Sequence, residues 1–472
     1  MDIELPSVGV VWTTLVVYFV ALFAIGAWAR RRTRDGDTYF IGGRGLGAFV
    51  GSLSYAAGSS SAWTILGVSG IAFSQGVSAV WLLPGTLTGH VLAWFWLGRR
   101  LNAVAHNNRW VTLNDLVASG VAGRQRAALL GVAALVVAIS FTFYVAAQFQ
   151  GAAATFANIM DVGEFQALLL GAGILLAYTL VGGFWAVSVT DALQAVLMLF
   201  AALLLPLFAL GVVGGAGSLG DGLAAVATPG QLSLTGEHQG LLAAGFLLGM
   251  VSIGLGPLGQ PHLLNRIMAI RDMGQLRLAR KVALGWFVIV LGGMFLLGLC
   301  GHVLLVDTPV ADSEQIFFAL TSQLLPAILA GVVIAAVLSA IMSTADSQLL
   351  VAASAVSHDL MHSTSLLVSR LVVLFVGVLA VVVAYAMPDA IFTRVLFAWN
   401  ALGAAFGPTV VVRLLKWPVR PGAVIAAVAT GFALTVVLYL SPDTPGDLAE
   451  RAVPFLCGFL ILLLGKRRGL LR

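Results

Sequence analysis

Long apolar runs recur along the whole chain, and short polar segments separate them. A helical run of this kind is long enough to cross the hydrocarbon core of a bilayer. The pattern predicts about thirteen membrane-spanning helices and no sheet, that is, an all-α polytopic membrane protein. The predicted spans are residues 9–29, 46–73, 78–98, 127–158, 164–182, 188–214, 240–262, 282–305, 322–355, 366–386, 390–413, 421–440 and 452–465.

Composition supports this interpretation. The chain is 60% hydrophobic and only 10% charged, with a mean hydropathy of +1.01, which excludes an ordinary soluble domain. Cys300 and Cys457 both lie in apolar runs, so neither a disulfide framework nor a metal cluster is indicated. The acidic N-terminus (Asp2, Glu4) lacks the basic segment of a signal peptide, so the first run is expected to be retained.

Basic residues predict the orientation. All Lys and Arg residues except Arg394 and Arg451 lie in alternate loops or in the C-terminal tail, with Arg266 assigned to the loop after the seventh span. The positive-inside rule then places the C-terminus in the cytoplasm and the N-terminus outside. The net charge of +5 follows from this topology and requires no nucleic-acid partner.

Two acidic residues, Asp191 and Asp346, fall inside predicted spans. Ionisable groups at membrane depth are costly, which makes them candidate functional residues. Asp346 shares one helical face with Ser343 and Ser347, so this face offers hard oxygen ligands. The alternative interpretation is a buried polar group that a neighbouring helix satisfies.

The second and seventh spans are predicted to be interrupted. Residues Ser54–Trp63 are rich in Gly and Ser, and Gly254–His262 contains two prolines and three glycines. Broken backbone is tolerated at this depth only where it lines a cavity or is buried in protein. Because the two spans are five apart, they favour an inverted-repeat transporter, although a Gly/Ser-rich span can also be a simple packing face.

Four motifs resemble the sodium:solute symporter family, and among its members the sodium/proline symporters of bacteria are most similar. They lie at Gly42–Gly47, Tyr178–Gln194, Gly259–Ala269 and Met342–Leu350. The resemblance covers essentially the whole chain. It implies a LeuT-type fold in a bacterial plasma membrane and Na⁺-coupled uptake of a small organic solute, such as an amino acid or a small carboxylate.

The same resemblance implies a division of the chain. Residues 1–45 are expected to form an extra N-terminal helix and a basic loop. Residues 46–414 form the ten-helix core, with repeats at 46–215 and 240–414. Residues 415–472 form two further helices and a basic tail.

The resemblance also implies two ion sites. Two carboxylates and one Na⁺ would leave the second site negative, so a protonated carboxylate or another ion is expected there. The principal Na⁺ site maps to Ala57, Ser60, Ala340, Ser343 and Thr344, and the possible second site maps to Asp191, Ser343, Asp346 and Ser347.

The solute pocket is less well defined. Ser59 replaces an Asp of the proline symporters, and Ile253 and Pro257 replace two aromatic residues that contact solute in that group, so the pocket is expected to differ. No Lys or Arg is expected near the pocket, so backbone amides would bind a solute carboxylate. Other candidate residues, each of which could instead serve helix packing, are Trp63, Tyr144, Gln148, Gln150, Gln260, Trp399 and Asn400.

Other function classes stay open at this point. Asp191 and Asp346 could relay protons in a proton-coupled carrier, and a transporter-like sensor is a further alternative, although the tail after the last span is too short for a signalling domain. No nucleotide loop or nucleophile triad is visible, so an enzyme is not expected. His262 is interpreted as structural, and a metal site at His358, Asp359 and His362 is a minor possibility.

Overall fold

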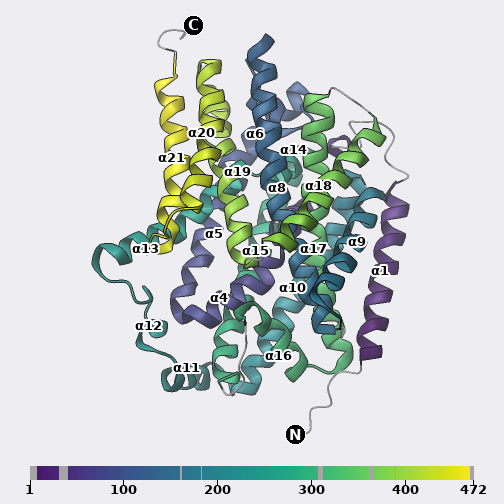
Figure 1. The fold of residues 1–472 in the computed structure, drawn as a ribbon, viewed down its shortest axis with the longest axis vertical. Helices are drawn as coiled ribbons and strands as arrows, with labels where there is room; N and C mark the ends of the chain where they lie inside the picture. Colours follow the sequence, from purple (N-terminus) through teal and green to yellow (C-terminus); the bar gives the residue numbers. More distant parts are fainter. Residues whose placement is uncertain are drawn as a thin grey trace.

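The computed structural model describes residues 8–30, 41–159, 162–181, 183–306, 312–361, 365–387 and 390–467, and within them it contains helices and no β-strand (Figure 1). This confirms the predicted all-α class. The helices are α1 (Val8–Arg30), α3 (Ala48–Ser59), α4 (Val68–Gln75), α5 (Leu82–Val91), α6 (Gly98–Asn108), α7 (Leu113–Val117), α8 (Gly123–Ile159), α9 (Glu164–Val181), α10 (Phe184–Val213), α11 (Ala216–Val226), α12 (Pro229–Leu232), α13 (Gly240–Ser252), α14 (Pro261–Ala269), α15 (Met273–Leu304), α16 (Ile316–Leu324), α17 (Ala327–Ser354), α18 (Leu366–Ala386), α19 (Ile391–Leu414), α20 (Pro421–Tyr439) and α21 (Leu448–Leu464).

The helices differ strongly in how far they are buried. In the described part of the chain, nine helical segments are long and apolar enough to span a membrane. In α19, 94% of the most apolar stretch of the helix is buried inside the protein. In α18 the corresponding share is only 28%. The exposed face of α18 carries mainly apolar side chains, so it suits contact with lipid. Helices α17 and α19 form the centre of the bundle.

The first predicted interruption is confirmed between α3 and α4. The helix α3 ends at Ser60, whose φ of −105° and ψ of 76° are not helical. A wide helical turn over Trp63–Gly67 then leads into α4. The carbonyls of Ala56 and Ala57 in the last turn of α3 therefore share one amide, that of Ser60, whereas a continuous helix would give each carbonyl an amide of its own.

The second predicted interruption is also confirmed. Residues Ile253–Gly259 form tight 3₁₀ turns, Gln260 is extended with ψ of 108°, and Pro261 starts α14. Proline suits this first position because its missing N–H has no helical partner there. At Gly256 an added Cβ would lie 1.8 Å from the Trp399 indole, so only glycine lets the two segments come this close.

One predicted boundary is wrong. The expected span over residues 322–355 is two helices, because α16 ends at Leu324 and α17 begins at Ala327. Pro326 separates them with ψ of 154°, since its ring cannot continue a helix. At its other end α17 continues through a wide turn, Ala355–Leu360, beyond the predicted limit.

The flanking helices lie on two sides of the bundle. Helix α1 packs against α10 and α17 at one edge, whereas α20 and α21 pack together at the opposite edge (Figure 1). This arrangement agrees with extra helices before and after a core. The division of the core into two repeats stays a prediction, and most of the first basic loop and His362 lie outside the described residues.

Candidate functional site

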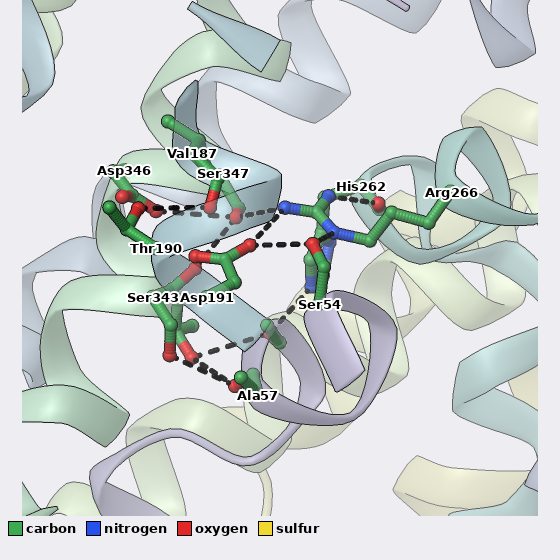
Figure 2. A network of polar contacts seen from close by, with 12 residues as sticks. Ser54, Ala57, Val187, Thr190, Asp191, His262, Arg266, Ser343, Asp346 and Ser347 are labelled. Atoms are coloured by element: carbon green, nitrogen blue, oxygen red, sulfur yellow. Dashed lines mark hydrogen bonds and ion pairs between the residues drawn. The ribbon is translucent and has the colours of Figure 1, made fainter. Parts of the chain in front are cut away.

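The last turn of α3 meets the middle of α17 at a group of oxygen atoms (Figure 2). The Ser343 hydroxyl donates to the carbonyls of Ala57 and Ala340, each at 3.2 Å. The Thr344 hydroxyl lies 3.3 Å from the carbonyls of both Ala57 and Gly58. Four of the five residues predicted for the principal Na⁺ site are thus brought together, and Gly58 is an additional oxygen ligand candidate that the motif comparison missed.

This group contains oxygen atoms only, and it is sealed from solvent. Ser343 and Thr344 are fully buried, and the carbonyls they reach belong to the end of a broken helix. Ser60, the fifth predicted residue, donates its amide to the carbonyls of Ala56 and Ala57 at 3.0 and 3.1 Å. A set of neutral carbonyl and hydroxyl oxygens is what a hard monovalent or divalent cation binds in proteins. The role of Ser60 as a ligand stays a prediction.

A buried arginine lies directly beside these oxygens. Arg266 is 1% exposed, and its guanidinium forms an ion pair with Asp191 at 2.8 Å. It also donates to the Ser54 hydroxyl at 2.7 Å, to the His262 carbonyl at 2.6 Å and to the Ser347 hydroxyl. One side chain of α14 therefore connects α3, α10 and α17 (Figure 2).

One expectation about arginine is wrong. Arg266 does not lie in a cytoplasmic loop but is buried in the interior, beside the predicted ion sites. The reason is that α14 runs for two turns after the break that ends at Gln260. These turns carry Arg266, a residue type typical of loops, into the interior of the bundle. Burial of the guanidinium is tolerated because a carboxylate and several oxygen acceptors surround it.

The four residues predicted for the second ion site gather around this arginine. Ser347 donates to the Ser343 carbonyl at 2.6 Å and contacts one oxygen of Asp346 at 3.3 Å. The other Asp346 oxygen, Oδ2, and Oδ1 of Asp191 are buried and have no hydrogen-bond partner among the described residues. Buried polar atoms are rarely left unpaired, so these two oxygens are candidate ligands for a cation or a water molecule.

Aromatic side chains occupy the space between the two helix breaks. Trp63 and Trp399 are buried, with ring centroids 6.4 Å apart at an angle of 61°. The Trp63 indole donates to the Ser59 carbonyl at 3.4 Å, and the Trp399 indole donates to the Ile253 carbonyl at 3.2 Å. Each indole is therefore hydrogen-bonded to one of the two interrupted helix segments. Pro257 lies in the second segment, Ile253–Gly259.

The predicted polar candidates divide into two groups. Gln148 accepts from the Ala62 amide at 3.1 Å, and Asn400 donates to Glu450 of α21 at 2.8 Å, so both have structural partners. Gln260 donates to the Trp399 carbonyl at 3.0 Å but leaves its own oxygen unpaired, and the Tyr144 hydroxyl is buried without a hydrogen-bond partner in the described part of the chain. The second group therefore keeps polar atoms available for a solute.

Sequence reasoning missed His90 on α5. Its ring nitrogens lie 3.0 Å from the Tyr55 hydroxyl and 3.4 Å from the Ser59 hydroxyl. The ring stacks on Phe287 with centroids 3.9 Å apart. A histidine inside an apolar span was the available signal, since ionisable side chains at membrane depth are rare.

A cavity of about 800 Å³ opens at the end of the bundle where α8 finishes and α19 starts. Glu164, Asp312 and Glu314 are among its lining residues, so its walls are acidic. The Glu314 carboxylate accepts the first two amides of α19 at 3.1 and 2.9 Å. Phe392, in that first turn, packs edge-on against Trp63 with ring centroids 6.0 Å apart, and Leu66, from the same wide turn as Trp63, lines this cavity, which we call the vestibule.

The polar cluster of His358 and Asp359, in the wide turn that follows α17, has structural partners. Asp359 accepts from Asn114 at 2.7 Å and from Thr112 at 3.2 Å, and His358 lies 2.9 Å from it. Among the described residues no group of three or more His, Cys, Asp or Glu side chains could hold a metal ion. The third member of the predicted cluster, His362, is not described.

Known proteins resemble this chain over most of its length. Residues 39–429 match the model of the sodium:solute symporter family. The osmoregulated proline transporter OpuE of Bacillus subtilis is 33% identical over 91% of this chain and 88% of its own length. The sodium/proline symporter of Escherichia coli is 33% identical over 90% of this chain and 87% of its own length.

Solved structures confirm the fold. A Na⁺-coupled sialic acid symporter in a substrate-bound, outward-open state superposes with a TM-score of 0.77 at 15% identity, over 96% of this chain and 98% of that one. Mhp1, a nucleobase-cation-symport-1 family transporter, superposes with a TM-score of 0.56 at 14% identity, over 90% and 94%. The LeuT-type fold that the family resemblance implies is thus confirmed. The chain belongs to the sodium:solute symporter family, and it is a multi-pass membrane transporter that couples solute movement to Na⁺.

Proposed function

We propose that the oxygens of Ala57, Ser60, Ala340, Ser343 and Thr344 bind the coupling Na⁺, with the Gly58 carbonyl beside them. The observation that carries this proposal is the contact of the Ser343 and Thr344 hydroxyls of α17 with backbone carbonyls in the last turn of α3, where that helix breaks. A hydroxyl proton can rotate away, which leaves lone pairs for the ion. Na⁺ then joins α3 to α17, and its binding favours the closed arrangement of the two helices.

The second site is a charged neighbour of the first. Asp191 and Asp346 together with Arg266 carry a net charge of −1 when all are ionised, so one Na⁺ brings the cluster to neutrality. Arg266 therefore removes the need for a protonated carboxylate or a second mobile ion that the two acids alone suggested. The two unpaired carboxylate oxygens are the proposed ligands, and the hydroxyls of Ser343 and Ser347 complete the set.

The solute pocket lies between the helix breaks and below the vestibule. Trp63 and Trp399 supply apolar walls, while the free oxygen of Gln260 and the Tyr144 hydroxyl supply polar contacts. Arg266 does not serve the pocket, because its donors are already bound to carboxylate, hydroxyl and carbonyl oxygens. An uncharged or zwitterionic small solute such as an amino acid fits this lining best.

Proline is one candidate solute, since the relatives are proline transporters. Ile253 and Pro257 carry no aromatic ring, so the pocket offers a different shape at these two positions. A small carboxylate is a second candidate. We propose that Ser59 and Gln148 support the walls of this pocket. The Ser59 carbonyl accepts from the Trp63 indole, and the Ser59 hydroxyl bonds His90. Gln148 accepts from the Ala62 amide. Asn400 is assigned to the contact with α21.

We infer that the vestibule faces the outside of the cell and that the C-terminus is cytoplasmic. The acidic vestibule lies at the end of the bundle where α1 begins, and the basic loops lie at the other end, where α21 finishes (Figure 1). This polarity agrees with the positive-inside rule. The bacterial proline transporters among the relatives support a bacterial plasma membrane and a transporter role without enzymatic chemistry.

The test is uptake by purified protein in proteoliposomes across a panel of amino acids and small carboxylates. An inward Na⁺ gradient is expected to drive accumulation of at least one solute, and an H⁺ gradient alone is not. A thermal-shift screen of the same panel in Na⁺ and in K⁺ identifies the solute independently of transport. Accumulation that follows the H⁺ gradient and ignores Na⁺ would overturn the proposed coupling.

A further inference from the structure

Helix α1, which lies outside the predicted transport core, docks along the ion-site helix through a regular stripe. Val11, Leu15, Tyr18 and Leu22 are buried, with spacings of three and four residues, as a packed helical seam requires. The opposite face is exposed. At Gly331 of α17, an added Cβ would lie 3.0 Å from Thr14, so the two helices approach closely here.

Tyr18 is the polar member of this stripe, and its hydroxyl joins both helices that carry the ion-site acids. The hydroxyls of Tyr18 and Ser339 share a hydrogen bond of 2.8 Å. The Gln194 amide donates to the Tyr18 hydroxyl at 3.2 Å. The Met342 sulfur lies 3.9 Å away as a weak acceptor.

The partners of Tyr18 are adjacent to the proposed ion ligands along each helix. Ser339 lies one turn before Ser343 on α17, and Gln194 lies almost one turn after Asp191 on α10. Residues three and four apart share a helical face, so a shift at Ser339 or Gln194 moves the ligand next to it. The Tyr18 hydroxyl therefore fixes the spacing of α10 and α17 just outside the ligand shell.

We propose that Tyr18 is a positioning residue that sets the Na⁺ affinity of the transporter through its hydrogen bonds to Ser339 and Gln194. Tyr18 itself touches no proposed ligand atom. Ion sites hold their ligands within a few tenths of an ångström, and supporting hydrogen bonds usually supply this precision. The inference rests on the proposed Na⁺ site between α3 and α17, and it assigns the first helix a role in coupling.

The test is the Na⁺ dependence of thermal unfolding of the purified full chain, with K⁺ replacing Na⁺ at constant ionic strength. Tyr18→Phe keeps the buried ring and removes only the hydroxyl. We expect the Na⁺ concentration for half-maximal stabilisation to rise about threefold to tenfold, the effect of losing about one hydrogen bond's contribution to binding. Thr13→Val is the matched control, because the Thr13 hydroxyl bonds only the Gly9 carbonyl of its own helix, and its half-maximal concentration is expected to stay at the wild-type value.

A double-mutant cycle separates positioning from simple packing. If the shared hydrogen bond carries the effect, Tyr18→Phe and Ser339→Ala are non-additive on the Na⁺ half-saturation. A lower unfolding midpoint in K⁺ with unchanged Na⁺ half-saturation would overturn the inference, since Tyr18 would then only dock α1. If Tyr18→Phe does not fold, Gln194→Leu and Ser339→Ala carry the test with the same expectation. Absence of Na⁺-specific stabilisation in the wild-type chain would overturn the proposed Na⁺ site itself, which distinguishes the two failures.

Discussion

The two adjoining groups of residues proposed as ion sites differ in how they are held together. The proposed principal site contains only neutral carbonyls and hydroxyls, and contacts of 3.2–3.3 Å join α17 to the last turn of α3 there. The neighbouring site contains two carboxylates and a guanidinium, joined by an ion pair at 2.8 Å. The first arrangement is weak without an ion, so the ion itself joins the helices. The second is already bound together by Arg266.

This difference separates two measurable quantities. Changes to the ion pair between Arg266 and Asp191 should mainly alter the stability of the ion-free protein, because they leave a buried charge without a partner. Changes among the neutral oxygens should mainly alter the response to Na⁺, because little is lost until the ion binds. The predictions below test that separation, starting with the largest expected effect.

Removal of the buried guanidinium should have the largest effect. Arg266→Met leaves Asp191 charged, buried and unpaired, and we expect a loss of about 3–5 kcal/mol of stability in Na⁺-free buffer. Thermal and denaturant unfolding of the purified protein measure it. The double variant Arg266→Met with Asp191→Leu removes both charges and should recover most of the loss. A single variant as stable as the double would show that the ion pair does not hold the helices.

The fold could be predicted from sequence to a large degree, because apolar runs of bilayer length and Gly/Pro interruptions leave clear patterns. The residues proposed for the principal site could be singled out because Ser343 and Thr344 lie in a recognisable motif. Arg266 could not be placed, since its polarity resembles that of a loop and its partner Asp191 is far away in sequence. The break at Pro326 was hidden inside a long apolar stretch, where hydropathy dominates.

Neutralising the unpaired acid should reduce Na⁺ binding without large loss of stability. Asp346→Asn keeps the side-chain shape but removes the charge that makes the cluster net negative. We expect the Na⁺ affinity to fall about tenfold or more, which corresponds to about 1.4 kcal/mol. Isothermal titration with Na⁺ measures this. Unchanged affinity in Asp346→Asn would remove Asp346 from the proposed second site.

Loss of the serine that links Arg266 to α17 should have a smaller effect on stability than loss of Arg266 itself. Ser347→Ala removes one acceptor of the guanidinium but leaves the ion pair with Asp191 intact. We expect about 1–2 kcal/mol of destabilisation, the usual cost of one hydrogen bond to a charged group. Unfolding midpoints in K⁺ measure it, with Ser354→Ala at the C-terminal end of α17 as a control, because the Ser354 hydroxyl donates to the Val351 carbonyl of its own helix. A loss as large as that of Arg266→Met would contradict the assignment.

The smallest effect on stability is expected at Tyr144. Its hydroxyl is buried and has no hydrogen-bond partner among the described residues, so Tyr144→Phe should change stability by less than about 0.5 kcal/mol. The same variant should raise the KM for solute in Na⁺-driven uptake, because the hydroxyl is assigned to the pocket. A large loss of stability with unchanged KM would mean that the hydroxyl has a structural partner instead.

The central claim is that hydroxyls of α17 and carbonyls of the broken α3 bind the coupling Na⁺. The most direct measurement is a Na⁺ titration of the Ser343→Ala, Thr344→Ala double variant, followed by thermal stabilisation and by uptake in proteoliposomes. The account predicts wild-type-like unfolding in K⁺ together with loss of Na⁺-dependent stabilisation and of Na⁺-stimulated uptake. A wild-type Na⁺ affinity in the double variant would contradict it.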